Sequence, residues 1–292
     1  MKLTELLRTE RPQLSFEVFP PKSRDGYDTV AAAAEQIAAL RPAFMSVTYG
    51  AGGGTSAYTL SLARDIRERF GVPSVAHLTC VSSTRATVAE RIRELRAAGI
   101  ENVLALRGDV PEERRHEDRS LWDYRYAATL VAELKAADPT LCVGGACYPE
   151  MHPESASRAD DIRYLKEKVD AGCDFLTTQM FFDNNILYSF LYKIREAGIT
   201  VPVIPGIMPI TSASFVRRVI SVANAFLPQR FLSILDRFGS DPAAMRAAGI
   251  AYATDQIVDL FANGHTCVHV YSMNKPDVAS AIFSNVAAIL GR

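Results

Sequence analysis

The sequence has almost no net charge and no long apolar run. Its 292 residues include 32 Lys and Arg against 33 Asp and Glu, which gives a formal net charge of −1 at pH 7. A balance this even provides no general field that would attract nucleic acid or an anionic membrane surface. No segment approaches the roughly 20 apolar residues of a membrane-spanning helix. We therefore expect neither partner, and local groups must hold any anionic ligand.

The sequence also lacks a C-x-x-C pair and the apolar core of a signal peptide. Glu5, Arg8, Glu10 and Arg11 interrupt its first 16 positions, which argues against a secretory signal. An odd number of cysteines inside apolar runs is typical of reduced, buried thiols. These features predict a cytoplasmic protein without disulfides. The five cysteines are Cys80, Cys142, Cys147, Cys173 and Cys267.

Short apolar runs alternate with longer amphipathic stretches along the chain. The runs are almost continuously apolar, as expected for parallel strands that are covered on both faces. We therefore predict eight parallel strands. They are Leu14–Pro20, Phe44–Tyr49, Ser74–Cys80, Asn102–Gly108, Cys142–Tyr148, Phe175–Phe182, Val201–Ile207 and Cys267–Ser272.

The stretches between these strands carry helical spacing. Gly99, Gly172 and Gly198 end three of them just before a strand, where a left-handed residue commonly closes a helix. A continuous series of βα units predicts an α/β fold with a single (β/α)₈ TIM barrel, one catalytic domain over residues 1–292. The helices are expected over Thr29–Leu40, Ala86–Ala98, Ala159–Ala171, Ile186–Ala197 and Met245–Ala262, with a short extra helix over Pro228–Gly239.

Polar residues gather where the predicted strands end, and this edge of a barrel is where ligands bind. Glu17 stands out because Phe16, Val18 and Phe19 surround it. Burial by such neighbours should raise the pKa of its carboxyl group, which suits a general acid. The alternative is a residue that faces out of the barrel and pairs with a helix Lys or Arg.

Two further segments combine a turn with polar groups. Gly108, between Arg107 and Asp109, permits close approach of a ring or a phosphate, while Asp109 could equally cap a helix that starts near Pro111. Residues 50–55 (GAGGGT) are glycine-rich but match neither the dinucleotide pattern G-x-G-x-x-G nor the Walker pattern. We expect a loop near the ligand there. The charged segment Pro111–Trp122 predicts a long loop on the catalytic face or a partly disordered one.

The histidines divide into two groups. His265, Cys267 and His269 occupy alternate positions, which would place them on one face of a strand. A soft metal site there is possible in principle, but we favour core residues at the N-terminal end of the last strand, far from the rim, and predict no metal. His77 lies near the end of its strand, where a core histidine and a cofactor contact are equally compatible with the sequence.

Several motifs together identify a family. SFEVFPPK, SVTYGAGG, HLTC, ALRGD, YPEMHPE, TTQMFFD and PGIMP follow one another from about Leu14 to Asn274. In this order and spacing they resemble methylenetetrahydrofolate reductase of the short bacterial type. The resemblance implies a (β/α)₈ barrel with non-covalent FAD and no Rossmann fold, which would account for the missing dinucleotide pattern.

The resemblance also implies residue roles. Glu17 matches the proton donor, and Asp109 matches an acidic residue beside the flavin that also contacts the folate. Folate contacts are implied for Thr48, Asp109, Gln179, Phe215 and Lys275. The implied FAD-binding positions are Thr48, Tyr49, Ala51, His77, Arg107, Gly108, Asp109, Tyr126, Ala127, Tyr148, His152, Asp161 and Lys168.

Three positions depart from the family pattern in the folate region. Phe215 and Lys275 stand where the family commonly has Gln and Arg, and Val219 stands where it has a stacking Phe. Lys275 keeps the positive charge but cannot form the two-pronged contact of a guanidinium with a carboxylate. Phe215, one turn before Val219, could compensate for the missing ring.

The activity implied by the resemblance is reduction of 5,10-methylenetetrahydrofolate to 5-methyltetrahydrofolate, ping-pong through FAD, with NADH or NADPH as donor. This would supply methyl groups for methionine synthesis, and family members are usually homo-oligomers. One alternative is another barrel flavoprotein such as proline dehydrogenase, although the expected Arg pair is missing from the last strand. A second is a pterin-binding or folate-binding barrel without flavin, which would be colourless.

Overall fold

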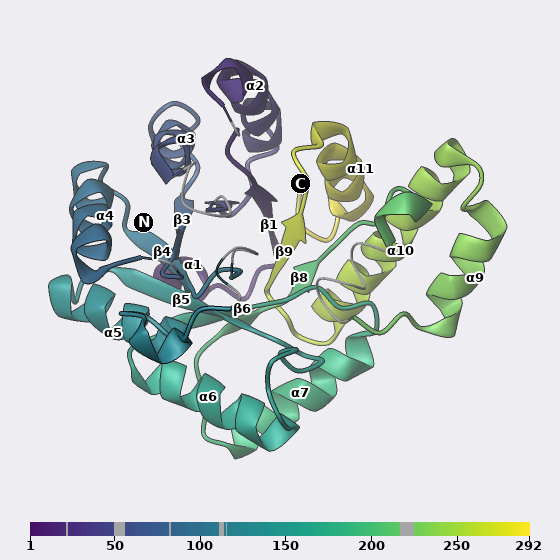
Figure 1. Ribbon diagram of the computed structural model, residues 1–292. Helices are drawn as coiled ribbons and strands as arrows, with labels where there is room; N and C mark the ends of the chain where they lie inside the picture. The colour runs from purple at the N-terminus through teal and green to yellow at the C-terminus, as the bar shows by residue number, and fades with distance from the viewer. Residues whose placement is uncertain (22, 50–55, 82, 111–113, 115, 217–224) are drawn as a thin grey trace.

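The computed structural model describes residues 1–21, 23–49, 56–81, 83–110, 114, 116–216 and 225–292. Nine parallel strands curve into a barrel that helices surround (Figure 1). The predicted (β/α)₈ barrel is therefore confirmed. The strands are β1 (Gln13–Val18), β2 (Met45–Val47), β3 (Ser74–Thr79), β4 (Asn102–Leu106), β5 (Cys142–Cys147), β6 (Phe175–Thr178), β7 (Val203–Ile204), β8 (Gly206–Ile207) and β9 (Cys267–Tyr271).

The ninth strand arises from a break in the seventh predicted one. Pro205 separates β7 from β8 and has no backbone N–H to donate to a neighbouring strand. β7 pairs with β6, while β8 pairs with β9 on the other side. The Pro205 carbonyl accepts a hydrogen bond from the amide of His269 at 2.8 Å. The prediction of one strand over Val201–Ile207 was thus wrong in detail. At Pro205 the barrel is closed by the covalent chain between β7 and β8, and not by pairing of two strands.

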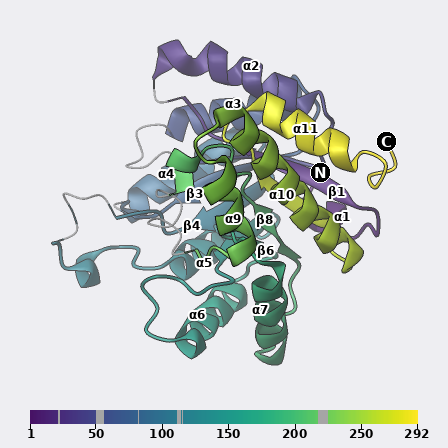
Figure 2. The ribbon, with the colours of Figure 1, turned by 90° about the vertical axis from the view of Figure 1, so that its right-hand side faces the viewer.

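The helices cover the outside of the barrel (Figure 2). All five helices predicted from spacing are present, and so is the short extra one. Gly99, Gly172 and Gly198 have φ values of 62°, 119° and 77°, as predicted for helix-closing residues. The helices are α1 (Leu3–Leu6), α2 (Tyr27–Ala38), α3 (Ser56–Glu68), α4 (Arg85–Ala97), α5 (Ala127–Ala137), α6 (Arg158–Asp170), α7 (Asn184–Glu196), α9 (Gln229–Phe238), α10 (Pro242–Ala262) and α11 (Pro276–Val286).

Two apolar layers leave the upper part of the barrel interior polar. One layer fills the space between the strands and the helices, with Phe16 and Val18 of β1 among its residues. The other fills the lower interior with Phe44, just before β2, Val75 of β3 and Phe175 of β6. Because side chains alternate along a strand, Ser15 and Glu17 point to the interior when Phe16 and Val18 point out. The sequence pattern of β1 therefore places a carboxyl group above an apolar floor.

Candidate functional site

Glu17 lies in the barrel interior among polar side chains of neighbouring strands. Its Oε2 atom is 3.6 Å from Nε2 of His77 on β3 and 4.0 Å from Nε2 of His269 on β9. The Ser46 hydroxyl on β2 donates a long hydrogen bond of 3.5 Å to the same oxygen. Only 17% of the Glu17 side chain is exposed. The alternative of an outward-facing residue paired with a helix cation is therefore excluded.

Burial controls the ionisation of this cluster. It raises the pKa of Glu17 to about 8, against which the Ser46 hydrogen bond acts only weakly. Burial also lowers the pKa of His77 and of His269 to about 3. Because a low-dielectric interior disfavours every charged form, burial favours a protonated carboxyl beside two neutral imidazoles. The predicted direction of the Glu17 shift is confirmed.

His269 connects Glu17 to the layer beneath it. Its Nδ1 atom is 2.7 Å from the Ser15 hydroxyl, and its Nε2 atom is 3.0 Å from the Ser46 hydroxyl. With His269 protonated on Nε2, Ser15 donates to Nδ1, Nε2 donates to Ser46, and Ser46 donates to Glu17. The expectation that His269 lies far from the site was wrong, since the polar layer of the barrel continues from Glu17 down to His269.

The histidine and cysteine positions near the start of β9 do not form the metal site considered from the sequence. His265 lies before the strand and stacks on Tyr188, with ring centroids 6.1 Å apart. Cys267 is buried in the apolar floor of the barrel. Among the residues that the structure describes, no three His, Cys, Asp or Glu side chains are grouped to hold a metal ion.

The turn after β4 brings backbone close to the rim. Gly108 has a φ of +86°, and a Cβ atom there would lie 2.9 Å from the Val81 side chain and 3.0 Å from Thr79. Only glycine fits this conformation and this space without strain. Asp109 follows and is exposed. The proposed capping role of Asp109 concerns residues 111–113, which lie outside the described part of the chain.

Arg107 takes part in an ion-pair network at the rim. Its guanidinium contacts both carboxylate oxygens of Glu154, at 2.5 and 3.1 Å. Arg119, from the charged segment after β4, reaches the same carboxylate at 3.2 Å. Part of that segment is therefore fastened to the rim, with a 3₁₀ turn over Arg119–Leu121. The Glu154 carboxylate lowers the local positive charge, and an anionic ligand at this place would compete with it for the Arg107 guanidinium.

Four predicted flavin positions lie together on the β5–α6 connection and the inner side of α6. The rings of Tyr148 and His152 meet edge to face, with centroids 4.6 Å apart. The Asp161 carboxylate accepts hydrogen bonds from the His152 amide at 3.2 Å and the Ser155 hydroxyl at 2.9 Å. Lys168 reaches inward and donates to the Ala146 carbonyl. Burial lowers the pKa of both Lys168 and His152.

The remaining predicted flavin positions are divided between two places. Tyr126 and Ala127 lie at the start of α5, where Tyr126 stacks on Tyr164 of α6 with ring centroids 6.0 Å apart. Thr48 and Tyr49 follow β2, and Tyr49 lines a small cavity with His77. Ala51 lies outside the described residues.

Three of the predicted folate positions belong to segments that meet at one apolar cluster. Phe215 packs against this cluster, and so do Met180, the neighbour of Gln179, and Met273, which precedes Lys275 by two residues. The Lys275 ammonium donates to the Thr211 hydroxyl at 3.1 Å. The structure therefore brings the segments of Gln179, Phe215 and Lys275 to one area. Val219 lies outside the described residues.

The sequence did not single out three residues of this site. Ser15 and Ser46 form the hydrogen-bonded layer under Glu17, and Glu154 binds Arg107. The alternation of Ser15 with Phe16 and of Ser46 with Met45 was a usable signal, because a serine next to a fully apolar position marks the inward face of a strand. For Glu154, no local pattern predicts the partner.

Known proteins resemble this chain over nearly its whole length. The model of the family described as methylenetetrahydrofolate reductase matches residues 2–287. A 5,10-methylenetetrahydrofolate reductase of Pectobacterium carotovorum is 34% identical over 93% of this chain and 89% of its own length. The Escherichia coli protein of the same name is 33% identical, over 92% and 88%. Methylenetetrahydrofolate reductase (NADH) 1 of Arabidopsis thaliana is 32% identical over 99% of this chain, which spans 51% of that protein.

Solved structures agree with the architecture. An uncharacterised protein from Clostridium thermocellum, described as binding two copies of 5-methyl-5,6,7,8-tetrahydrofolic acid, superposes over both whole chains with a TM-score of 0.71 at 12% identity. Oxaloacetate acetylhydrolase superposes with a TM-score of 0.55 at 12% identity. At these identities the likeness concerns the fold alone. The family model and the close relatives together show that this chain belongs to the methylenetetrahydrofolate reductase family.

Proposed function

We propose that the chain reduces 5,10-methylenetetrahydrofolate to 5-methyltetrahydrofolate, with non-covalent FAD at the rim and NADH or NADPH as the hydride donor. The observation that carries this proposal is the Glu17 carboxyl, which is buried in the barrel interior 3.6 Å from His77 and 4.0 Å from His269 and whose pKa is raised by burial. Opening the methylene bridge of 5,10-methylenetetrahydrofolate requires a proton at one of the folate nitrogens that the bridge joins. A carboxyl group with a pKa near neutrality is an effective donor for that step.

The rim residues fit a flavin dinucleotide by the chemistry of their groups. Arg107 and Lys168 supply positive charge for a diphosphate, and Tyr148 and His152 supply ring faces and donors. Gly108 allows close approach of a planar ring. The Nε2 atom of His77 is buried and lacks a hydrogen-bond partner among the described residues. An unsatisfied buried polar atom of this kind is typical of a binding site. When bound, FAD would accept a hydride from the nicotinamide and supply it to the folate.

The protein residues would contribute charge and proton control. Glu17 donates its proton to the folate nitrogen whose bond to the bridging carbon breaks. Ser46 holds the carboxyl through a hydrogen bond as it becomes charged, and His269 in turn holds the Ser46 hydroxyl. Asp109, exposed at the rim, would favour positive charge on the opened folate. Gln179, Phe215 and Lys275 would position the folate. One site serving both substrates in turn gives ping-pong kinetics.

The proposal also covers the metabolic role, the location and the assembly of the protein. The active protein would be a homo-oligomer in the cytoplasm, and its product would supply methyl groups for methionine synthesis. Among the described residues, no helix has the length and apolar character needed to cross a membrane.

The experiment is to separate the two half-reactions in Glu17→Gln. We expect NADH to bleach the bound flavin at nearly the wild-type rate, while folate turnover falls by about 10²- to 10⁴-fold, the usual contribution of a general acid. Glu35→Gln, at an exposed position of α2, is the matched control for loss of one carboxyl. Folate reduction near the wild-type rate in Glu17→Gln would exclude Glu17 as the acid. A purified protein without flavin would exclude the proposed redox function.

A further inference from the structure

A pocket separate from the predicted flavin and folate positions lies between the β5–α6 connection and α7. Its volume is about 410 Å³, within the range of small-molecule sites. Pro149 and Glu150 come from the connection and Arg158 from the start of α6, and α7 contributes the rest of the lining. None of these residues belongs to the positions assigned above to folate or flavin.

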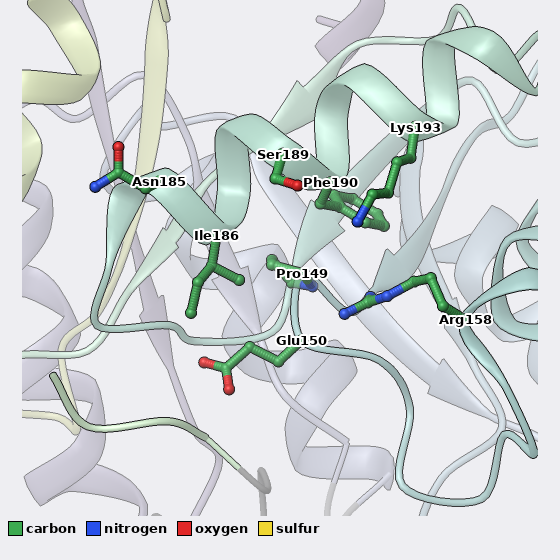
Figure 3. A pocket seen from close by; sticks show the side chains of 8 residues that line it. All are labelled: Pro149, Glu150, Arg158, Asn185, Ile186, Ser189, Phe190 and Lys193. Atoms are coloured by element: carbon green, nitrogen blue, oxygen red, sulfur yellow. The ribbon is translucent and has the colours of Figure 1, made fainter.

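Two cations enter this pocket from different helices. Figure 3 shows the Arg158 and Lys193 side chains extending toward the same space from α6 and α7. Arg158 donates to the Tyr148 carbonyl at 3.3 Å and is 4.0 Å from the Asp161 carboxylate. The Lys193 ammonium has no hydrogen bond or ion pair with any residue that the structure describes. Lys193 is exposed, so its ammonium stands beside the cavity with water as its partner, next to a guanidinium that is near the Asp161 carboxylate.

Glu150 forms no ion pair with these two cations, although the charge of Arg158 acts on its carboxyl group. In Figure 3 its carboxylate lies away from both of them. Its Oε2 atom accepts a hydrogen bond from the Phe226 amide at 2.6 Å. Its Oε1 atom is buried and has no partner among the described residues. This oxygen is an acceptor that a donor group on a ligand, or a water molecule, would satisfy.

The rest of the lining is mixed. Asn185 and Ser189 of α7 are polar and exposed, and Ile186 of the same helix is partly exposed. Phe190 and Pro149 are buried behind this surface, with Phe190 part of the main apolar layer. A partly exposed apolar side chain next to two convergent cations suits an anion carried on an apolar group.

We propose that this pocket binds a small anionic ligand, a carboxylate or phosphate ester joined to an apolar group, with the anion between Arg158 and Lys193. The apolar group lies on Ile186, the partly exposed apolar side chain of the lining. Charge-assisted hydrogen bonds from the two cations supply the specificity. The site is separate from the predicted flavin positions but touches them through Arg158, which donates to the Tyr148 carbonyl and is 4.0 Å from the Asp161 carboxylate.

Calorimetric titration of the flavin-loaded protein with three probes tests this proposal. Phenyl phosphate and 3-phenylpropionate carry the two anions on the same ring, and 3-phenylpropanamide is the neutral control. We expect one-to-one binding of at least one anion and no measurable binding of the amide. A signal from phenyl phosphate alone assigns the site to phosphate esters, and one from 3-phenylpropionate alone assigns it to carboxylates. Equal binding of the amide would overturn the proposal.

Variants locate the binding. Lys193→Gln should lower the affinity for the anion by about tenfold, the usual effect of losing one charge-assisted hydrogen bond. Arg237→Gln removes an exposed cation from α9 and should leave affinity unchanged. Ser189→Trp should abolish binding by filling the pocket, with an unchanged thermal midpoint showing that the protein is folded. The proposal fails if neither anion gives saturable binding, or if Lys275→Gln weakens it and Lys193→Gln does not.

Discussion

The buried carboxyl of Glu17 should make the protein less stable as the pH rises, and Glu17→Gln should remove that dependence. The pKa of Glu17 is about 8 in the folded protein and has an ordinary value of 4.5. A folded-state pKa above the unfolded value means that the folded protein binds the extra proton. The stability from this group is therefore complete below 4.5 and is lost as the pH rises through 8.

The size of the effect follows from the two pKa values. Protonation linkage gives a loss of about 1 kcal/mol at pH 5 and about 5 kcal/mol at pH 9, relative to a side chain that does not titrate. The wild-type protein should thus lose about 4 kcal/mol against Glu17→Gln over this interval. These figures are upper values, because 17% of the side chain is exposed and water can relax around the charge.

Urea unfolding measures this difference directly. Wild type and Glu17→Gln would be compared at several pH values with flavin saturating in both, so that other titrating groups cancel. Glu35→Gln, exposed on α2, controls for the loss of one carboxyl. A stability difference that stays constant within about 0.5 kcal/mol from pH 5 to pH 9 would refute the raised pKa and the linkage reasoning.

Three other changes should have separable effects. Gly249→Ala should lower the free energy of unfolding by about 1–3 kcal/mol in urea titrations, because the new Cβ would lie 1.8 Å from the Ile210 carbonyl oxygen; an unchanged midpoint would contradict this. Lys275→Gln should raise KM for the folate by about tenfold and leave NADH-driven bleaching of the flavin unaffected, in steady-state and stopped-flow assays. Lys168→Met should increase flavin loss on dialysis, and full retention would show that this buried ammonium does not hold the cofactor.

The sequence predicted the fold well because its signals are local. Apolar runs, helical spacing and three closing glycines each depend on a few neighbouring residues, and the structure confirms them. The predicted strands commonly extended too far at their C-terminal ends. Phe175–Phe182 shortens to Phe175–Thr178, for example, because hydrogen bonding to both neighbours ends before apolar composition does. The proline at position 205 is a signal for the split, but the apolar run around it favoured a prediction of one continuous strand.

The site was only partly predictable. Glu17 could be identified because a carboxyl among aromatic residues is anomalous within a single strand. The role of His269 could not be identified, since its contacts with Ser46 and Glu17 join residues more than 200 positions apart. The pairing of Arg107 with Glu154 could not be predicted for the same reason, because it depends on how the connections after β4 and β5 bend over the rim. Local patterns predict which residues face inward, and only the closed barrel determines which of them meet.

The interruption at Pro205 also affects how the barrel can move. Among the described strands, β7 and β8 are joined by the chain and not by a shared ladder, and each pairs with one outer neighbour. The circumference at this point can therefore widen by rotation about a few backbone bonds without breaking a backbone ladder. The hydrogen bonds that would have to open are those of the Gly206 amide with the Thr178 hydroxyl and of the Tyr271 hydroxyl with the Thr178 carbonyl. Since β8 leads into the segment of Phe215 and pairs with the strand that carries His269 and precedes Lys275, such a change would adjust the folate side of the site while the strands around Glu17 keep their register.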